Sequence, residues 1–253
     1  MKTAKIRTVT VGEGKPKVLV PIVGATREEI LAKGEEIREL DFDVVEWRAD
    51  FYGDALNRTR LLATLEELNH VLGDKPLLFT FRTAKEGGFR GILPEEYADL
   101  SIAAAESGFA DAVDVEILSG DRLVRKMIGG IHRAGKTVIA SSHEFKCTPP
   151  KDEMIRRMQK MQDMGADILK IAVMPQTKAD VLTLLCATEE MARCHAERPL
   201  ITMSMSPSGI ISRICGEAFG SAMTFGAVGQ TSAPGQIPVE QLNAVLEILH
   251  AAG

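Results

Sequence analysis

Eight short β-rich runs alternate with eight longer segments of helical period along this chain, and the alternation constrains the fold more than any other feature. Strands that alternate with helices pair in parallel, because each crossover helix carries the chain back to the end of the sheet where the next strand starts. Eight such units in 253 residues fit an α/β fold, the (β/α)8 TIM barrel. The predicted strands span 17–23, 43–48, 76–82, 111–117, 137–142, 167–173, 200–205 and 222–228. The predicted helices lie near 26–40, 56–72, 94–107, 120–134, 150–164, 177–196, 207–218 and 238–251.

The residues at the helix starts agree with this assignment. Thr26 precedes Arg27-Glu28-Glu29, which predicts a capping box, and Thr148 and Thr177 stand where the fifth and sixth helices need N-caps. A doubly wound open sheet is the alternative fold for the same alternation. No Gly-x-Gly-x-x-Gly follows the first strand, so the commonest ligand site of that alternative is missing.

The segment before the first strand, Ile6–Val11 followed by Gly12-Glu13-Gly14, has the pattern of a hairpin. We expect this N-terminal β-hairpin to close the bottom of the barrel. No linker, low-complexity tract or change in composition divides the chain. We therefore expect residues 1–253 to form a single domain.

Composition and charge argue against two classes of protein. The formal net charge is −5, and with one Trp, two Tyr and no dense Lys/Arg stripe the chain lacks the features of a nucleic-acid surface. No apolar run approaches the roughly 20 residues that span a bilayer, and residues 1–5 show no apolar signal segment, so we expect a cytoplasmic protein. The four cysteines have neither Cys-x-x-Cys pairing nor zinc-ligand spacing, and we expect free thiols.

Lys170 lies in the middle of the apolar strand predicted at 167–173. Lysine is rarely buried without a partner, because an ammonium group loses its hydration there. One interpretation is a nucleophile, since burial disfavours the charged form and a neutral amine can attack a carbonyl to form a Schiff base. The other is a structural lysine that pairs with a carboxylate from a neighbouring strand. This strand alone does not decide between the two.

Charged residues recur at the ends of five consecutive predicted strands. In a (β/α)8 barrel the catalytic groups lie at the carboxyl ends of the strands and in the loops that follow. One such charge is typical of a solvated strand end or a structural ion pair, whereas the recurrence favours a polar active site. The residues are Glu46, Arg48 and Asp50, then Arg82 with Lys85 and Glu86, then Asp114 and Glu116, then His143 and Glu144, and finally Lys170.

The residue types indicate the chemistry. His143, on the strand next to Lys170, can carry protons for an amine nucleophile. Arg48, Arg82 and Arg213 favour an anionic or polyhydroxylated small-molecule substrate, because guanidinium groups bind carboxylates in a bidentate way. The other histidines fall in candidate helices, and no His-x-His or His-Glu-x-x-His occurs, which argues against a transition-metal site. Magnesium held by carboxylates alone stays open as an alternative.

Seven short motifs occur together and in order, and their joint spacing is more specific than any one of them. They are Glu46-Trp47-Arg48, Phe81–Gly88, Ser142-His143, Lys170-Ile171-Ala172, Met203-Ser204-Met205, Ser212-Arg213 and Ser232-Ala233-Pro234-Gly235-Gln236. With these motifs the chain resembles the type I 3-dehydroquinate dehydratases, the Schiff-base class of the shikimate pathway. The resemblance covers essentially the whole chain.

The resemblance implies a homodimeric barrel with no metal and no dissociable cofactor. It implies a lyase that dehydrates 3-dehydroquinate to 3-dehydroshikimate. Lys170 would condense with the C3 ketone, His143 would move the protons, and Glu86 would orient His143 or assist the leaving water. The implied substrate-binding residues are Arg213 for the carboxylate, Glu46, Arg48 and Arg82 for the ring hydroxyls and the ketone, Met203 and Met205 as apolar walls, and Ser232 and Gln236 in a loop that closes over the substrate.

Two other functions would use the same residues. A Schiff-base aldolase would use Lys170 on another ketone or aldehyde, and would release a retro-aldol product. A non-catalytic barrel would bind the metabolite without consuming it. The second alternative has less support, because none of the expected lysine, histidine, glutamate and arginine groups is missing.

Overall fold

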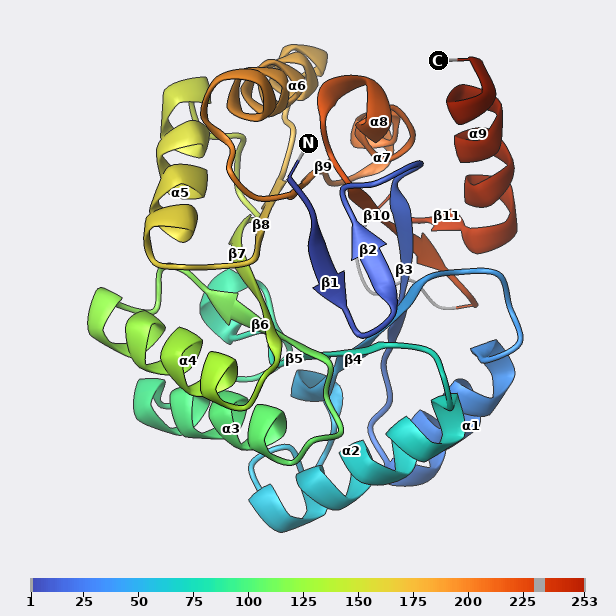
Figure 1. Cartoon of the computed structure of the whole chain (residues 1–253), viewed down its shortest axis with the longest axis vertical. Helices are drawn as coiled ribbons and strands as arrows, with labels where there is room; N and C mark the ends of the chain where they lie inside the picture. Colours follow the sequence, from blue (N-terminus) through green and yellow to red (C-terminus); the bar gives the residue numbers. More distant parts are fainter. Residues whose placement is uncertain (1, 230–234, 253) are drawn as a thin grey trace.

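The computed structural model describes residues 2–229 and 235–252, and its centre is a sheet of parallel strands surrounded by helices (Figure 1). The hydrogen-bonded order is β11-β10-β3-β4-β5-β6-β7-β8-β9, and neighbouring strands in this sheet are parallel. Each of the eight predicted strands is present. The strands are β3 Lys17–Ile22, β4 Val44–Arg48, β5 Leu77–Thr80, β6 Ala112–Glu116, β7 Thr137–Glu144, β8 Ile168–Val173, β9 Leu200–Ser204, β10 Met223–Ala227 and β11 Ile237–Pro238.

The sheet curls until its two sides meet between β9 and β10. Leu200 and Ser221 form a parallel bridge there, and the Ala222 N–H donates to the carbonyl oxygen of Leu200 at 2.7 Å. This closure confirms the predicted (β/α)8 barrel and excludes the open doubly wound sheet. The sequence pattern does not predict β11, because a strand of 2 residues is too short to show a period.

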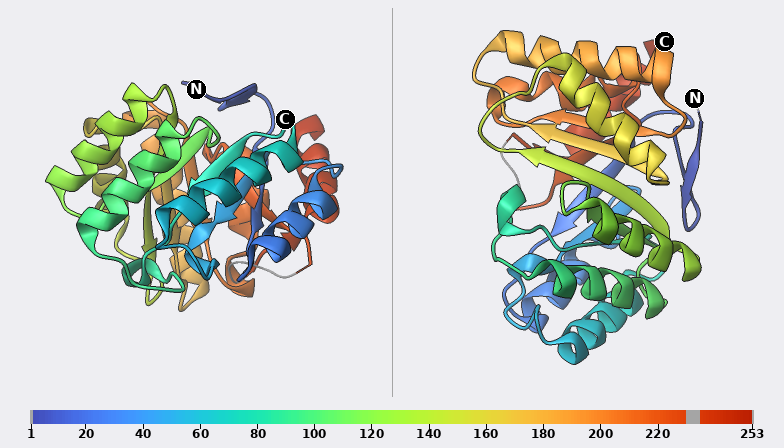
Figure 2. Two further views of the ribbon diagram at one scale, coloured as in Figure 1. Left: turned by 90° about the horizontal axis from the view of Figure 1, so that it is seen from below. Right: turned by 90° about the vertical axis from the view of Figure 1, so that its left-hand side faces the viewer.

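Helices cover the outside of the barrel (Figures 1 and 2). The predicted capping box at Thr26 is present, and Thr177 forms another. The N-cap predicted at Thr148 is wrong: Pro150 takes that place, and the Thr148 hydroxyl donates to the carbonyl oxygen of Met174. In the described part of the chain, no helix combines the length and the apolar character needed to cross a membrane. The helices are α1 Arg27–Ile37, α2 Arg58–Leu72, α3 Pro94–Glu106, α4 Asp121–Arg133, α5 Lys151–Asp163, α6 Lys178–Glu190 and α9 Val239–Ala252.

The predicted helix over 207–218 is wrong, because this segment is broken into short turns. A Cβ at Gly209 would lie 2.2 Å from the carbonyl oxygen of Ser204, so the glycine lets the chain pack directly against the end of β9. The close approach turns the segment inward after its first residues. The pieces are the 3-10 helix η4 Pro207–Gly209, α7 Ile211–Ile214 and α8 Gly216–Phe219.

The N-terminal hairpin consists of β1 Ala4–Ile6 and β2 Val9–Val11, which pair antiparallel. In the right-hand view of Figure 2 it lies across one end of the barrel, opposite to the end toward which the strands run. Ile6 and Val11 are fully buried against the first residues of the barrel strands. The predicted closure of the bottom of the barrel by this hairpin is confirmed.

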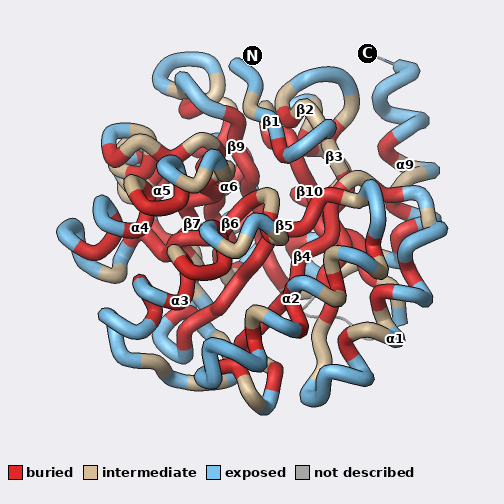
Figure 3. The backbone as a smooth tube through the Cα atoms, turned by 60° about the horizontal axis from the view of Figure 1, so that its bottom comes forward, coloured by how far each residue is buried: buried red, intermediate tan, exposed pale blue. Residues whose placement is uncertain are grey.

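Side chains alternate between the two faces of each barrel strand. Along β4, Val45 and Trp47 belong to the apolar layer between the sheet and the helices, whereas Val44 belongs to the cluster inside the barrel. Figure 3 shows the strands buried and the outer sides of the helices exposed. The charged positions of β4, Glu46 and Arg48, have the same parity as Val44 and therefore point into the barrel.

Candidate active site

The barrel interior changes from apolar to polar along the strands. The layer nearest the hairpin includes Leu19, Val44, Leu78, Ala112, Ile139, Ile168, Ile201 and Met223. The alternation of a strand brings the side chain two residues further on to the same face. That second layer includes Glu46, Thr80, Asp114, Ser141 and Lys170, all buried. The polar layer therefore lies toward the carboxyl ends of the strands, where barrels of this type carry their catalytic groups.

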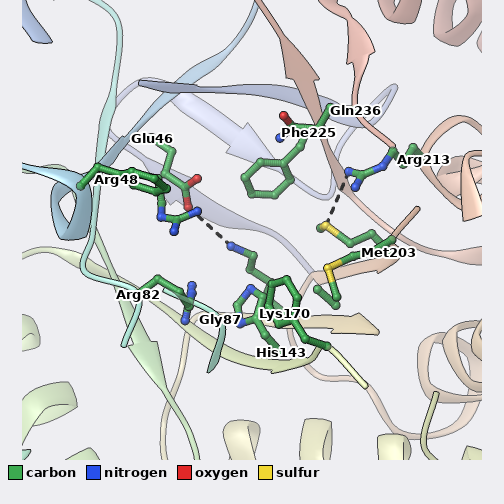
Figure 4. Close-up of a pocket in the computed structure, with 14 residues that line it drawn as sticks. Glu46, Arg48, Arg82, Gly87, His143, Lys170, Met203, Arg213, Phe225 and Gln236 are labelled. Atoms are coloured by element: carbon green, nitrogen blue, oxygen red, sulfur yellow. Dashed lines mark hydrogen bonds and ion pairs between the residues drawn. The ribbon is translucent and has the colours of Figure 1, made fainter. Parts of the chain in front are cut away.

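A cavity above this polar layer brings together most of the predicted site residues (Figure 4). The rings of Phe51, Phe145 and Phe225 complete its wall. Glu86 does not line this cavity, and Ser232 lies outside the residues that the structure describes. The predicted residues that do line it are Glu46, Arg48, Arg82, His143, Lys170, Met203, Met205, Arg213 and Gln236.

Lys170 points into the cavity from β8 and is only 3% exposed. Its Nζ lies 3.4 Å from Oδ2 of Asp114 and 3.6 Å from Oε1 of Glu46. It also lies 4.6 Å from the centre of the Phe225 ring, a favourable position for a cation. The carboxylates come from β6 and β4, neither of which pairs with β8, whereas the structural interpretation places the partner on a neighbouring strand. The amine is therefore held in the interior of the barrel, where a substrate can reach it.

Arg82, just after β5, organises the carboxylates around Lys170. Its Nη2 lies 2.8 Å from Asp114 Oδ2, and its Nη1 donates to Glu116 and to Ser141, each at 3.0 Å. Burial opposes the charge of Arg82, but the carboxylates of Asp114 and Glu116 outweigh it and hold the pKa of Arg82 well above its ordinary value. Burial likewise opposes the charge of Asp114, but Arg82 and Lys170 lower the pKa of Asp114. These groups are thus ionised at neutral pH.

His143 and Glu86 form a buried pair at the wall of the cavity. Oε2 of Glu86 accepts a hydrogen bond from the backbone N–H of His143 at 2.9 Å and lies 3.0 Å from Nδ1 of its ring. Burial, followed by the Glu116 carboxylate, raises the pKa of Glu86 to about 8. Burial and the positive charge of Arg82 hold the pKa of His143 well below its ordinary value. A neutral ring that donates from Nδ1 to Glu86 carries its lone pair on Nε2, which leaves that nitrogen able to accept a proton.

Arg48 is held in place by Asp50, which lies in the 3-10 helix η1 (Ala49–Phe51) after β4. The Asp50 carboxylate accepts from Nε and Nη2 of Arg48, both at 2.8 Å, and also from the backbone N–H of Phe89 at 2.9 Å. Bidentate bonds of this kind fix the plane of a guanidinium group. Arg48 therefore faces the cavity in one orientation.

Arg213 reaches the cavity from α7, and the break in the predicted seventh helix is what places it there. It is 1% exposed, and its Nη1 lies 3.7 Å from the sulfur of Met203. Burial lowers the pKa of Arg213 to about 10, so the side chain still carries its charge at neutral pH. The cavity thus has a cation on the side opposite to the Glu46 carboxylate (Figure 4).

A sequence profile of the type I 3-dehydroquinase family matches residues 18–252. The chain belongs to this family. The 3-dehydroquinate dehydratase of Salmonella typhimurium is 50% identical over 252 residues, which cover 100% of both chains. The solved structure of the type I 3-dehydroquinate dehydratase from Clostridium difficile with covalent modified comenic acid is 44% identical, with a TM-score of 0.97 over 100% of each chain. The 3-dehydroquinate dehydratase from Enterococcus faecalis is 40% identical, with a TM-score of 0.91 over 97% of this chain and 98% of that one.

The site of this type I 3-dehydroquinase family member contains residues to which the sequence motifs assign no role. Asp114 and Glu116 stand out in the sequence as alternating charges, but only the closed barrel shows that they surround Arg82. Phe225 and Phe145 carry no chemical signal in the sequence. Phe225 lies two residues after Met223 in β10, so both side chains point into the barrel. Once β10 is assigned, this alternation could have identified Phe225 as an interior residue.

The carboxylates that could have held magnesium are paired with cationic side chains in this arrangement. Glu46 and Asp114 lie beside Lys170, and Glu116 is bonded to Arg82. Within residues 2–229 and 235–252, no group of three or more His, Cys, Asp or Glu side chains is placed to hold a metal ion. The acidic residues of the cavity therefore serve the lysine and the arginine.

Proposed function

We propose that this protein dehydrates 3-dehydroquinate to 3-dehydroshikimate and water through a Schiff base on Lys170, as a step of the shikimate pathway. The observation that carries the proposal is the position of Lys170 in the interior of the barrel, in the same cavity as the neutral His143 and the cation Arg213. Membership of the type I 3-dehydroquinase family supports the substrate.

The first step joins Lys170 to the substrate. Lys170 gives one proton to His143, and the resulting amine attacks the C3 carbonyl carbon, so that a C–N bond forms, the C–O π bond opens and a proton moves from the nitrogen to the oxygen. His143 returns its proton to the same oxygen, which leaves as water and produces an iminium ion. Asp114 and Glu46, 3.4 and 3.6 Å from Nζ, stabilise the positive charge that stays on nitrogen. The iminium then acts as an electron sink for the next step.

The second step removes water from the ring. His143 takes the C2 proton, and the C–H electron pair moves toward the iminium to form an enamine. The enamine then expels the C1 hydroxyl, which receives the proton from His143 and departs as water. Hydrolysis of the conjugated iminium releases 3-dehydroshikimate and restores the Lys170 amine. The proton that His143 removes is thus returned in the leaving water, so the cycle consumes no external acid.

Glu86 acts through His143 in this mechanism. Its Oε2 bonds both to the His143 backbone and to Nδ1, which fixes the ring plane and turns Nε2 toward the cavity. When His143 gains a proton from C2, Nδ1 keeps its donor bond to Glu86. We therefore assign Glu86 as the residue that positions the acid–base group.

The remaining predicted residues, apart from Arg82, would bind the substrate. Arg213 would take the carboxylate, since a guanidinium suits its geometry. Arg82 is engaged by Asp114 and Glu116, so its main role would be to hold those carboxylates in place. The other proposed contacts are Glu46 and Arg48 to the ring hydroxyls, Met203 and Met205 along the apolar side of the ring, and Gln236 with Ser232 over the bound substrate.

We also propose that the protein is a cytoplasmic homodimer that needs no metal and no dissociable cofactor, and the family resemblance supports this. One chain has a mass of 27.5 kDa, and sedimentation should then give twice that mass. The mass of a single chain at micromolar concentration would contradict the dimer.

Turnover of 3-dehydroquinate by Lys170→Ala tests the proposal, with Lys178→Ala as the matched control. Lys178 is exposed at the start of α6 and does not line the cavity. Lys170→Ala should abolish formation of the conjugated product while its circular dichroism is unchanged, and Lys178→Ala should turn over normally. Normal turnover by Lys170→Ala would refute the mechanism. A retro-aldol product from the wild type would favour the aldolase instead.

A further inference from the structure

A second cavity borders the His143–Glu86 pair, and Lys170 does not line it. It has a volume of about 320 Å³, within the size range of small-molecule pockets. Glu86 lines this cavity and not the first, whereas His143 and Phe145 line both. The two cavities therefore share a wall that contains the proposed acid–base group.

Glu86, which lines this cavity, has one carboxyl oxygen that makes no hydrogen bond to the described residues. The residue is 5% exposed, and its Oε2 is occupied by His143. Its Oε1 is buried and has no hydrogen-bond partner among residues 2–229 and 235–252. With the pKa of Glu86 raised to about 8 by burial and Glu116, the group keeps its proton at neutral pH and can donate from Oε1. A buried polar atom of this kind favours a bound partner.

The exposed part of the second cavity combines two large apolar side chains with two cations. Leu118 and Phe145 contribute large apolar side chains that are 55% and 38% exposed. Lys85 and Lys146 are exposed beside them, and neither ammonium group has a hydrogen bond or ion pair within the described ranges.

Besides Glu86, two carboxylates line the cavity. Glu116 is buried and paired with Arg82 at 3.0 Å, and Glu144 accepts from the backbone N–H of Lys146 at 3.2 Å. Because the charge of Glu116 is matched by Arg82, two cations stand against the one acid Glu144 at the opening, which suits an anion.

We infer that this cavity binds a small aromatic carboxylic acid that carries a ring hydroxyl. The hydroxyl bonds to Oε1 of Glu86, the ring packs against Leu118 and Phe145, and the carboxylate lies toward Lys85 and Lys146. Its effect on turnover rests on the proposed function. Because Glu86 positions His143, an occupant of this cavity changes the acid–base group without entering the substrate cavity, and it lowers kcat more than it raises KM.

Calorimetric titration of the full-length protein with 4-hydroxybenzoate tests this site without any reference to turnover. Leu118→Trp fills the cavity from an exposed position, and a Lys85→Ala/Lys146→Ala double variant removes both cations. We expect one molecule bound per chain, loss of binding in Leu118→Trp, and an affinity about fivefold weaker in the double variant, since exposed ion pairs contribute modestly. Benzoate, which lacks the hydroxyl, should bind more weakly than 4-hydroxybenzoate, and Lys178→Ala should bind like the wild type.

Two results would overturn the inference. One is no binding at millimolar 4-hydroxybenzoate. The other is binding that both Leu118→Trp and the double lysine variant leave unchanged, which would place the ligand in the Lys170 cavity. Circular dichroism shows whether Leu118→Trp is folded, and the double variant provides an independent readout if it is not. A wild type that binds the acid but does not consume 3-dehydroquinate would refute the proposed function and leave this site standing.

Discussion

Replacing Asp114 by Asn should destabilise the fold, because it removes one partner of a buried ion pair. Asp114 is 1% exposed, lies 2.8 Å from Nη2 of Arg82 and 3.4 Å from Nζ of Lys170. Breaking such a pair costs about 3–5 kcal/mol. Arg82 keeps Glu116 and Lys170 keeps Glu46, so the lower end of that range applies, and we expect a loss of about 3 kcal/mol in the free energy of unfolding.

Urea unfolding at pH 7 measures this loss, and Asp99→Asn provides a matched control. Asp99 pairs with Lys126 at 2.6 Å, but the side chains are 62% and 45% exposed. Exposed pairs of this kind contribute about 0–1 kcal/mol, so the control should lose less than about 1 kcal/mol. A loss in Asp114→Asn no larger than that of Asp99→Asn would refute the reasoning that the buried network stabilises the barrel.

The same variant has a predictable pH dependence. Arg82 and Lys170, against the effect of burial, lower the pKa of Asp114 in the folded state below its ordinary value of 3.8. A carboxyl with a lowered folded pKa stabilises the protein above its unfolded pKa, and this stabilisation is lost as the pH falls through the folded pKa. The stability difference between the wild type and Asp114→Asn should therefore be constant from pH 5 to pH 7 and shrink below about pH 4. A difference that stays constant down to pH 3 would contradict the ionised assignment.

Two further variants test the cavity. Glu86→Gln removes a carboxyl whose folded pKa burial raises from 4.5 to about 8. The protonated carboxyl therefore contributes fully to the free energy of unfolding below pH 4.5, and this contribution is lost as the pH rises through 8. The stability of the wild type relative to Glu86→Gln should fall between pH 5 and pH 8 in urea titrations, and a flat profile would argue against the raised pKa. For Arg213→Ala, loss of a buried charge-assisted contact to the substrate carboxylate should raise KM by about 30-fold or more, with a smaller effect on kcat. Steady-state kinetics with 3-dehydroquinate decide this, and an unchanged KM would remove Arg213 from the proposed binding site.

Much of the fold could be predicted because two regular patterns in the sequence determine it. Alternation of β-rich and helical segments defines the strands, and the two-residue period within a strand decides which side chains meet inside the barrel. Val44, Glu46 and Arg48 share one parity, so their common direction follows from the sequence once β4 is assigned. Lys170 lies in the interior by the same reasoning, on the opposite side of the sheet from Leu169 and Ile171.

The parts that could not be predicted depend on contacts between distant segments. Arg82 is bonded to Asp114 and Glu116, 32 and 34 positions further along the chain (114 − 82 and 116 − 82), and no local pattern pairs them. The sequence groups Glu86 with the cavity residues, yet the turn at η2 (Ala84–Glu86) places it in the wall of the second cavity and not of the first. The broken seventh helix follows from the approach of Gly209 to β9, which the helical period of the segment conceals.

Reductive trapping on Lys170 tests the central claim most directly. The protein is mixed with 3-dehydroquinate and borohydride, the intact mass is measured, and the modified peptide is mapped. An imine at Lys170 predicts one stable adduct per chain on the peptide that contains residues 168–173, and no adduct in Lys170→Ala. A folded protein that converts 3-dehydroquinate without forming an adduct on Lys170 would contradict the account, because the lysine would then serve only as the ion-pair partner of Asp114 and Glu46.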